Sequence, residues 1–373
     1  MQHLYLAPAE MSARRGSVPS LDGLRAISIS LVLLAHFVNK AIPGGLGVYV
    51  FFVISGFLIT RLLLAEQAAT GTVSLKMFYA RRICRLYPVI IVFAAFVILF
   101  DIALGRPFNY LEPASALGYF ANYLGVWFEA HGIEQQMPFA VFWSLSLEEH
   151  FYILFPFAFI LLKADPIRLV LLVTLLCIGC LLLRLGEATL HPELLYTQTF
   201  YVLSQYRLDS IGFGVLLALA CQTVDGRKVL LRLTQPVFVT IALTVILGCL
   251  LIRDPWFRET WRYSLLGISI VIVVSAVLFG ERYHLVHRFL NTVVLRWIGR
   301  LSYSLYVWHK GVSSFLPIES LPHWKQSVVC LFASFVVAPI SYYAVEQPFL
   351  TLRSRFRIGE AGRPVISTVP NRI

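Results

Sequence analysis

The chain has 373 residues, of which 58% are hydrophobic and only 14% are charged. So few charged side chains cannot cover the surface of a water-soluble protein of this size. The composition therefore excludes a soluble enzyme and predicts an all-α, polytopic membrane protein. The formal net charge is +11. Basic loops beside membrane spans explain this charge, and no basic loop interleaved with aromatic residues indicates nucleic acid. We therefore expect the protein to lie in a lipid bilayer and not to bind nucleic acid.

Ten apolar stretches follow one another along the chain, and each has about the length of a membrane-spanning helix. They cover residues 24–41, 48–65, 87–104, 141–162, 170–185, 208–223, 236–252, 263–279, 301–316 and 327–345. With the N-terminus in the cytoplasm, most lysines and arginines fall in cytoplasmic segments, as the positive-inside rule requires. The sequence thus predicts about ten transmembrane helices with both termini cytoplasmic. We expect a cytoplasmic segment over 1–20, a transmembrane domain over 21–349 and a basic cytoplasmic tail over 350–373.

The first span carries an arginine and a histidine, Arg25 and His36, eleven positions apart. Eleven residues make about three helical turns, so both side chains share one face and lie about 16 Å apart along the axis. Charged and titratable groups at membrane depth are costly and usually functional. The alternative for His36 is a hydrogen bond to a neighbouring helix, and the spacing alone does not decide between the two.

The segment 76–87 is basic and aromatic, which predicts an interfacial helix on the cytoplasmic side that leads into the third span. Guanidinium groups match phosphoryl oxygens, so Arg81, Arg82, Arg85 and Arg300 are candidates for holding a phosphate-bearing substrate. The positive-inside rule explains the same arginines without any ligand, and the residues alone favour that explanation.

Four further polar residues are expected at the depth of His36. Glu148 and Glu149 lie about two turns into the fourth span, and Arg207 and Asp209 open the sixth span from the same side. A carboxylate that fixes the imidazole tautomer would make His36 a general base. Adjacent helical residues diverge by about 100°, so only one of the two glutamates is expected to face the site. The alternative is a structural ion pair with Arg207.

Six ordered blocks resemble the acyltransferase-3 family of membrane-bound O-acyltransferases, which modify cell-surface polysaccharides and some secondary metabolites. The blocks are residues 21–36 with their Arg-x10-His pattern, 47–58, 79–88, 143–152, 207–214 and 299–309, and residues 345–349 fit as well. Each block alone is a weak signal, but the ordered set is highly specific and covers nearly the whole chain.

This resemblance implies a bacterial inner-membrane enzyme that moves an acyl group, usually acetyl, from cytoplasmic acyl-CoA to a hydroxyl of a surface glycan such as an O-antigen or exopolysaccharide. It implies an essential role for His36 and Arg25, and acyl-CoA handling for Arg81 and Arg82. Acyl-CoA is then a donor substrate, and we expect no tightly bound cofactor and no metal. Two residues depart from the pattern of many family members, Tyr49 and His150, and both positions bear on substrate selection.

The resulting hypothesis places the acyl-CoA phosphates near Arg81, Arg82, Arg85 and Arg300, with the pantetheine arm passing Arg25 toward His36. Glu148 or Glu149 would orient His36, which deprotonates the acceptor hydroxyl. Oxyanion donors would come from Ser144 or Tyr303. The residues expected to bind substrate are Trp143, Ser144, Arg207, Asp209, Tyr303 and His309.

Three alternatives remain open at this point. His36 itself could carry the acyl group in a two-step transfer. The acceptor could be a small molecule such as a macrolide or a lipid-linked sugar. A transporter also combines many helices with central charges, although the chain lacks a recognisable inverted repeat. The sequence gives no oligomeric state.

Overall fold

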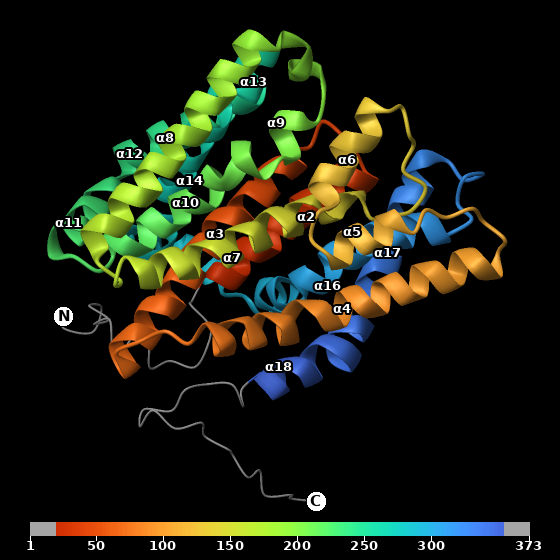
Figure 1. Ribbon diagram of the computed structural model, residues 1–373, viewed down its shortest axis with the longest axis horizontal. Coiled ribbons are helices and arrows are strands. Elements are labelled where there is room, and N and C mark those ends of the chain that lie inside the picture. The colour runs from red at the N-terminus through yellow and green to blue at the C-terminus, as the bar shows by residue number, and fades with distance from the viewer. Residues whose placement is uncertain (1–19, 354–373) are drawn as a thin grey trace, which may run out of the picture.

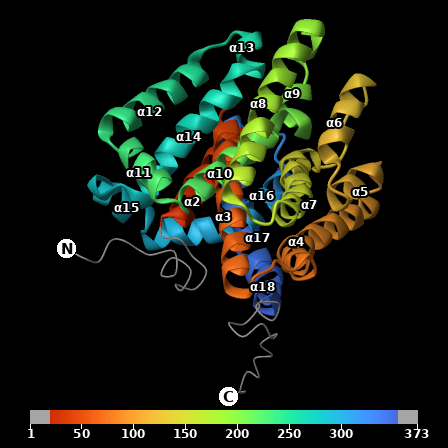
Figure 2. The same cartoon turned by 60° about the vertical axis from the view of Figure 1, so that its left-hand side comes forward.

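The computed structural model describes residues 20–353, and this part of the chain is helical and contains no strands. The long helices lie side by side, with α2, α3, α10 and α16 in the middle of the bundle (Figures 1 and 2). Nearly every side chain of α10 is buried, as is the middle of α16. The expected terminal segments 1–20 and 350–373 lie outside the described residues, apart from residue 20 and residues 350–353.

Each predicted apolar stretch overlaps one long helix. These helices are α2 (Leu21–Phe37), α3 (Gly44–Thr70), α4 (Leu75–Ala103), α7 (Trp143–Leu161), α8 (Pro166–Leu190), α10 (Ser204–Ala220), α12 (Pro236–Leu251), α14 (Trp261–Phe279), α16 (Val293–Phe315) and α17 (His323–Ser341). Shorter helices connect them: α5 (Leu111–Leu117), α6 (Ala121–Ala130), α9 (Thr199–Val202), α11 (Val224–Leu233), α13 (Pro255–Glu259) and α15 (His284–Leu290). A π-helical turn, η4 (Tyr342–Glu346), joins α17 to α18 (Gln347–Arg353).

Six helices of the described region are long and apolar enough to cross a membrane, or seven if a bent pair forms one span. The six are α3, α4, α7 with its preceding turn, α8, α14 and α17 with its extension. The bent pair joins Thr199–Ala220 to Val224–Leu233 at 117°. The helices therefore suit a multi-pass membrane protein, while the count of ten and the orientation of the termini stay predictions.

Two local predictions are wrong. The basic segment 76–87 is not a separate interfacial helix, because α4 runs from Leu75 to Ala103 with Pro88 inside it. One proline removes a single backbone donor, which a long membrane helix tolerates. The first two predicted stretches, 24–41 and 48–65, leave residues 42–47 as their connection, but α3 begins at Gly44, so residues 38–43 make the connection instead.

Glycine lets the central helices approach closely, as two crossings show. A Cβ atom on Gly214 of α10 would lie 2.0 Å from the carbonyl oxygen of Val53 in α3. A Cβ atom on Gly299 of α16 would lie 1.9 Å from the carbonyl oxygen of Asp22 in α2. Only glycine permits such contact, and small residues at crossings are typical of membrane helices. The second crossing fixes α2 against α16, which carry the two histidines described next.

Candidate active site

His36 of α2 pairs with a second histidine, His309 of α16. Nδ1 of His36 lies 3.1 Å from Nε2 of His309, and the ring centroids are 4.9 Å apart in a stacked arrangement. Nδ1 of His309 lies 2.7 Å from the carbonyl oxygen of Tyr306, one helical turn earlier. His309 is fully buried, whereas His36 is exposed. A series of hydrogen bonds therefore links the backbone carbonyl of Tyr306, through His309, to the accessible imidazole of His36.

The two hydrogen bonds, from His309 to the Tyr306 carbonyl and between the two histidines, determine the tautomers of the two neutral rings. A carbonyl oxygen only accepts, so Nδ1 of His309 donates to Tyr306 and carries the proton. Nε2 of His309 then has the free lone pair and accepts from Nδ1–H of His36. The remaining nitrogen of His36, Nε2, is left with its lone pair. A lone pair held on an exposed imidazole in this way suits a general base or a nucleophile.

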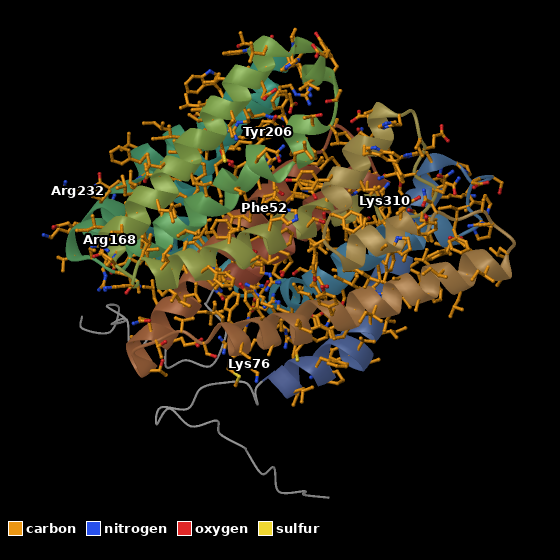
Figure 3. The ribbon with its side chains drawn as sticks, in the orientation of Figure 1. Phe52, Lys76, Arg168, Tyr206, Arg232 and Lys310 are labelled. Atoms are coloured by element: carbon orange, nitrogen blue, oxygen red, sulfur yellow. The ribbon has the colours of Figure 1, made fainter. Side chains whose placement is uncertain are left out.

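A small cavity of about 80 Å³ lies between α2, α3, α4, α7 and α16. Its lining includes three arginines, Arg25, Arg82 and Arg85, and the hydroxyl residues Ser144 and Tyr306. The hydroxyls of Ser144 and Tyr306 are 2.6 Å apart. Figure 3 shows Phe52, another lining residue, in the middle of the bundle. Tyr306 thus lines the cavity and also accepts, through its backbone carbonyl, the hydrogen bond of His309.

The glutamates occupy different positions from those expected. Glu148 lines the cavity and accepts hydrogen bonds from the hydroxyls of Ser55 at 3.1 Å and Tyr152 at 3.3 Å. Glu149 does not line it, and its buried Oε1 has no hydrogen-bond partner among residues 20–353. One glutamate of the two faces the site, as the helical geometry requires.

Neither glutamate holds His36. The Nδ1 atom through which a carboxylate was expected to orient this ring is bonded to His309 instead. The physical reason is helix register: Glu148 lies one turn along α7 from Ser144, whose contact is Tyr306 rather than His309. The structure thus corrects the expected His36–glutamate pair to a His36–His309 pair.

The predicted phosphate-binding arginines separate into groups. Arg85 and Arg82 line the cavity, and the Arg82 guanidinium also stacks over the Tyr152 ring at 3.8 Å. Arg81 makes an ion pair with Glu66 at 2.6 Å. Arg300 is exposed and is not part of the cavity lining. Arg82 and Arg85, together with Arg25, are therefore the arginines that the fold brings together.

Arg207 and Asp209 belong to a separate buried network. Asp209 forms an ion pair with Arg184 at 2.8 Å, and both side chains are fully buried. The Arg207 guanidinium lies 4.1 Å from the Tyr263 ring centroid and donates to the Tyr201 carbonyl at 2.8 Å. Neither residue lines the cavity. The expected convergence with His36, and the alternative ion pair between Arg207 and a glutamate, are both absent from the contacts of the described residues.

The other predicted site residues lie around the cavity. Trp143 packs against the Tyr201 ring at 4.8 Å and the Phe52 ring at 6.0 Å. Tyr303 lines the cavity and donates a hydrogen bond from its hydroxyl to the Leu86 carbonyl at 2.7 Å, so that hydroxyl is already paired with the backbone.

The two departures from the family pattern, Tyr49 and His150, lie outside the cavity lining. The Tyr49 hydroxyl donates to the Tyr263 carbonyl at 2.6 Å, and Nδ1 of His150 is 2.7 Å from the Ser204 hydroxyl.

The sequence analysis did not single out three residues that the structure uses. Tyr306 and Ser55 line the cavity, and Arg184 forms the buried ion pair with Asp209. Tyr306 lies three residues before His309, and this spacing on a helix puts the two on one face. Arg184 lies at the end of the predicted stretch 170–185, and a lone arginine at the end of an apolar stretch signals a buried ionic partner. Ser55 gives no such signal, because a single serine in an apolar helix commonly bonds to its own backbone.

The profile of the Acyltransferase domain matches residues 18–345. The chain belongs to the acyltransferase-3 family. This confirms the resemblance that the ordered sequence blocks indicated. No solved structure matches the chain significantly.

Curated relatives of this acyltransferase-3 chain include two long bacterial proteins. A Staphylococcus aureus protein with the name "Putative O-acetyltransferase" is 29% identical over 356 residues, which cover 89% of this chain and 57% of the relative. The peptidoglycan O-acetyltransferase of Listeria monocytogenes is 27% identical over 350 residues, which cover 90% of this chain and 56% of that protein. The chain therefore spans little more than half the length of these relatives.

Proposed function

We propose that this protein is a transmembrane O-acyltransferase that moves an acetyl group from acyl-CoA to a hydroxyl of a bacterial cell-surface glycan. The observation that carries the proposal is the His309–His36 pair, which leaves a lone pair on an exposed imidazole nitrogen. The names of the relatives support acetyl as the group and a glycan as the acceptor. The positive-inside bias supports the bacterial cytoplasmic membrane, with His36 toward the outer face.

The donor route begins at the arginines. Arg25, Arg82 and Arg85 share one small cavity, and three guanidinium groups out of bulk water suit the phosphates of acyl-CoA. The pantetheine arm then follows the cavity toward Ser144 and Tyr306. At about 80 Å³ the cavity is smaller than the roughly 300 Å³ of a typical small-molecule site, so donor binding requires the surrounding helices to separate.

The chemistry is a single acyl transfer. Nε2 of His36 takes the proton of the acceptor hydroxyl, and the oxygen attacks the thioester carbonyl. The C–O bond forms, the C–S bond breaks, and the same proton passes from His36 to the leaving CoA sulfur. His309 holds His36 in the required tautomer and accepts the hydrogen bond from Nδ1–H throughout. The rival step attaches the acyl group to Nε2 of His36 first, and the acceptor then removes it.

The test measures CoA release and acceptor acetylation by purified protein in nanodiscs, with acetyl-CoA and crude surface glycan. We expect His36→Ala to abolish both signals. Arg168→Gln is the control, because Arg168 is an exposed arginine of α8 remote from the cavity lining (Figure 3). Equal turnover by the His36 variant and the wild type would overturn the proposal. An acyl group trapped on the His36 peptide after rapid quenching would replace the one-step route with the two-step route.

Two further measurements separate the alternative functions. Acetylation of a macrolide or a lipid-linked sugar, with no product on the glycan, would change the acceptor class and keep the transferase. Counterflow of a solute in proteoliposomes without any acyl-CoA consumption would favour a transporter instead.

Replacing Arg85 by glutamine should raise KM for acetyl-CoA by about tenfold, since one charge-assisted phosphate contact is lost.

A further inference from the structure

Two lysines lie beside the His36–His309 pair. Lys310 directly follows His309 in α16, and its ammonium group is within electrostatic reach of both imidazole rings. Lys40 lies in the connection between α2 and α3, four residues after His36, and it is within electrostatic reach of Lys310. We call Lys40 and Lys310 the lysine pair. Two positive charges therefore lie close to the imidazole that the proposed reaction uses.

No carboxylate among residues 20–353 forms an ion pair with either lysine. Within that part of the chain, the charged group that acts on the Lys310 ammonium is Lys40, so the two charges repel each other. Arg106, by contrast, has Asp101 within electrostatic reach. Like charges held close together attract counter-ions, and an anion that binds between them recovers the free energy of their repulsion.

The backbone around each lysine is held by hydrogen bonds. The side-chain oxygen of Asn39 accepts from the backbone N–H two residues later at 2.8 Å, which shapes the turn that carries Lys40. The Ser314 hydroxyl donates to the Lys310 carbonyl at 3.0 Å, near the end of α16. Lys40 is exposed and Lys310 is partly exposed. A ligand that approaches the exposed ring of His36 therefore meets the lysine pair.

The lysine pair lies far from the arginines expected to hold the donor. Just after the end of α4, Arg106 donates to the Ser314 carbonyl at 3.3 Å, one turn past Lys310. Lys76 lies at the other end of α4, and Figure 3 shows Lys310 and Lys76 toward different ends of the bundle. About 27 Å of helix separates Arg85 from the end of α4. A phosphate held at Arg85 therefore leaves the lysine pair without an anion.

We propose that the lysine pair selects an anionic acceptor, a glycan that carries a carboxylate or phosphate group near the hydroxyl to be acylated. This inference rests on the proposed function, because it names the acceptor class of the same site. Lys310 binds the anionic group while Nε2 of His36 takes the proton of the neighbouring hydroxyl. A lysine has three donors and a compact charge, so it binds either kind of anion. The lysines exchange no proton and form no covalent bond in the reaction.

The first experiment measures binding and requires no turnover. A fluorescent oligosaccharide rich in glucuronic acid is titrated onto the purified protein in nanodiscs of zwitterionic lipid. Its counterpart has the carboxyl groups chemically reduced to alcohols, which removes the charge and keeps the sugar hydroxyls. We expect the acidic probe to bind about tenfold more tightly, as one charge-assisted contact provides. Raising the salt concentration should reduce this difference, because the charges are accessible to solvent.

Substitutions assign the binding to the lysine pair. Lys310→Gln should weaken binding of the acidic probe by about tenfold and leave the neutral probe unchanged. Lys310→Arg keeps the charge and should retain the preference. Lys325→Gln is the matched control, because it removes one positive charge from an exposed position at the start of α17. Displacement of the probe by a glycerol phosphate oligomer, more readily than by free uronate, would assign a phosphate rather than a carboxylate to the acceptor.

The second experiment follows acetyl transfer to the same two oligosaccharides. Lys310→Gln should raise KM for the acidic acceptor about tenfold and leave KM for the neutral acceptor unchanged. Equal binding of the two probes, an equal effect of Lys310→Gln and Lys325→Gln, or displacement of the probe by anionic phospholipid alone would overturn the proposal. Transfer without any charge preference would refute the acceptor class and keep the transferase. Charge-selective binding without transfer to any acceptor would keep the anion site and refute the proposed function.

Discussion

At the scale of single residues, His36 makes a structural contact that is compatible with its proposed catalytic role. The hydrogen bond between two helices and the general base were alternative interpretations of this residue, and the geometry confirms the first without excluding the second. The bond to His309 joins α2 to α16, and it also fixes which nitrogen of His36 carries the proton. No carboxylate is bonded to either histidine among the described residues, so the tautomer is set by the Tyr306 carbonyl acting through the His309 imidazole.

Substitution of His309 tests that role. His309→Leu removes the acceptor for Nδ1–H of His36, so we expect kcat to fall by about 10²-fold with little change in KM for acetyl-CoA. His309→Gln keeps an acceptor oxygen and a donor amide, and it should retain much more activity. Steady-state kinetics in nanodiscs compares the two variants. An equal loss in both would show that His309 acts by packing alone.

The buried ion pair between Arg184 and Asp209 yields a prediction about stability. Asp209→Asn leaves the Arg184 charge uncompensated in a fully buried site, which should cost about 3–5 kcal/mol of the free energy of unfolding. The double variant Arg184→Met, Asp209→Leu removes both charges and should recover most of this loss. Thermal unfolding in detergent measures both. Unchanged stability together with a raised KM for the acceptor would restore the substrate-binding role expected from the sequence.

At the scale of helices, the two elements that carry the histidine pair, α2 and α16, are among the least typical membrane spans. Helix α2 has only 17 residues, and α16 contains arginines, a lysine and a histidine, so neither is among the six long apolar helices. Both are surrounded by more apolar neighbours in the middle of the bundle (Figure 2). Polar groups at bilayer depth are tolerated in such positions because protein, not lipid, faces them.

The close crossing of α3 and α10 gives a prediction at this scale. Gly214→Ala would force its Cβ against the Val53 carbonyl, so the helices must separate and stability should fall by about 1–3 kcal/mol. Gly248→Ala in α12 is the matched control, since no atom lies within 4 Å of the added carbon. That change should be neutral or slightly stabilising in a helix. Equal melting temperatures for the two variants would contradict the close crossing.

At the scale of the whole molecule, the proposed reaction depends on orientation. The arginine-lined cavity must face the acyl-CoA of the cytoplasm, and His36 must lie toward the outer face. Lys76 precedes the α4 arginines and Lys40 follows His36, and both lysines are exposed. These two positions therefore report the two sides of the membrane.

Impermeant thiol labelling of intact cells measures this orientation. We expect Lys40→Cys to react from outside, and Lys76→Cys to react only after the membrane is opened, since thiols inside the cell are shielded from the reagent. The background carries Cys84→Ala, because Cys84 is a free, partly exposed thiol on α4. Reaction of both positions from the same side would require a different topology, and with it a different donor route.

Composition and helical periodicity determined the class of this protein, its long helices and the shared face of Arg25 and His36, because these features depend on local chain geometry. The ordered motifs determined its family. Tertiary structure alone decided the partners: His309 rather than a glutamate for His36, Arg184 for Asp209, and Arg82 with Arg85 rather than Arg300 at the cavity. The physical reason is that a contact between helices depends on how each is rotated, shifted and crossed against its neighbours, which no single helix encodes.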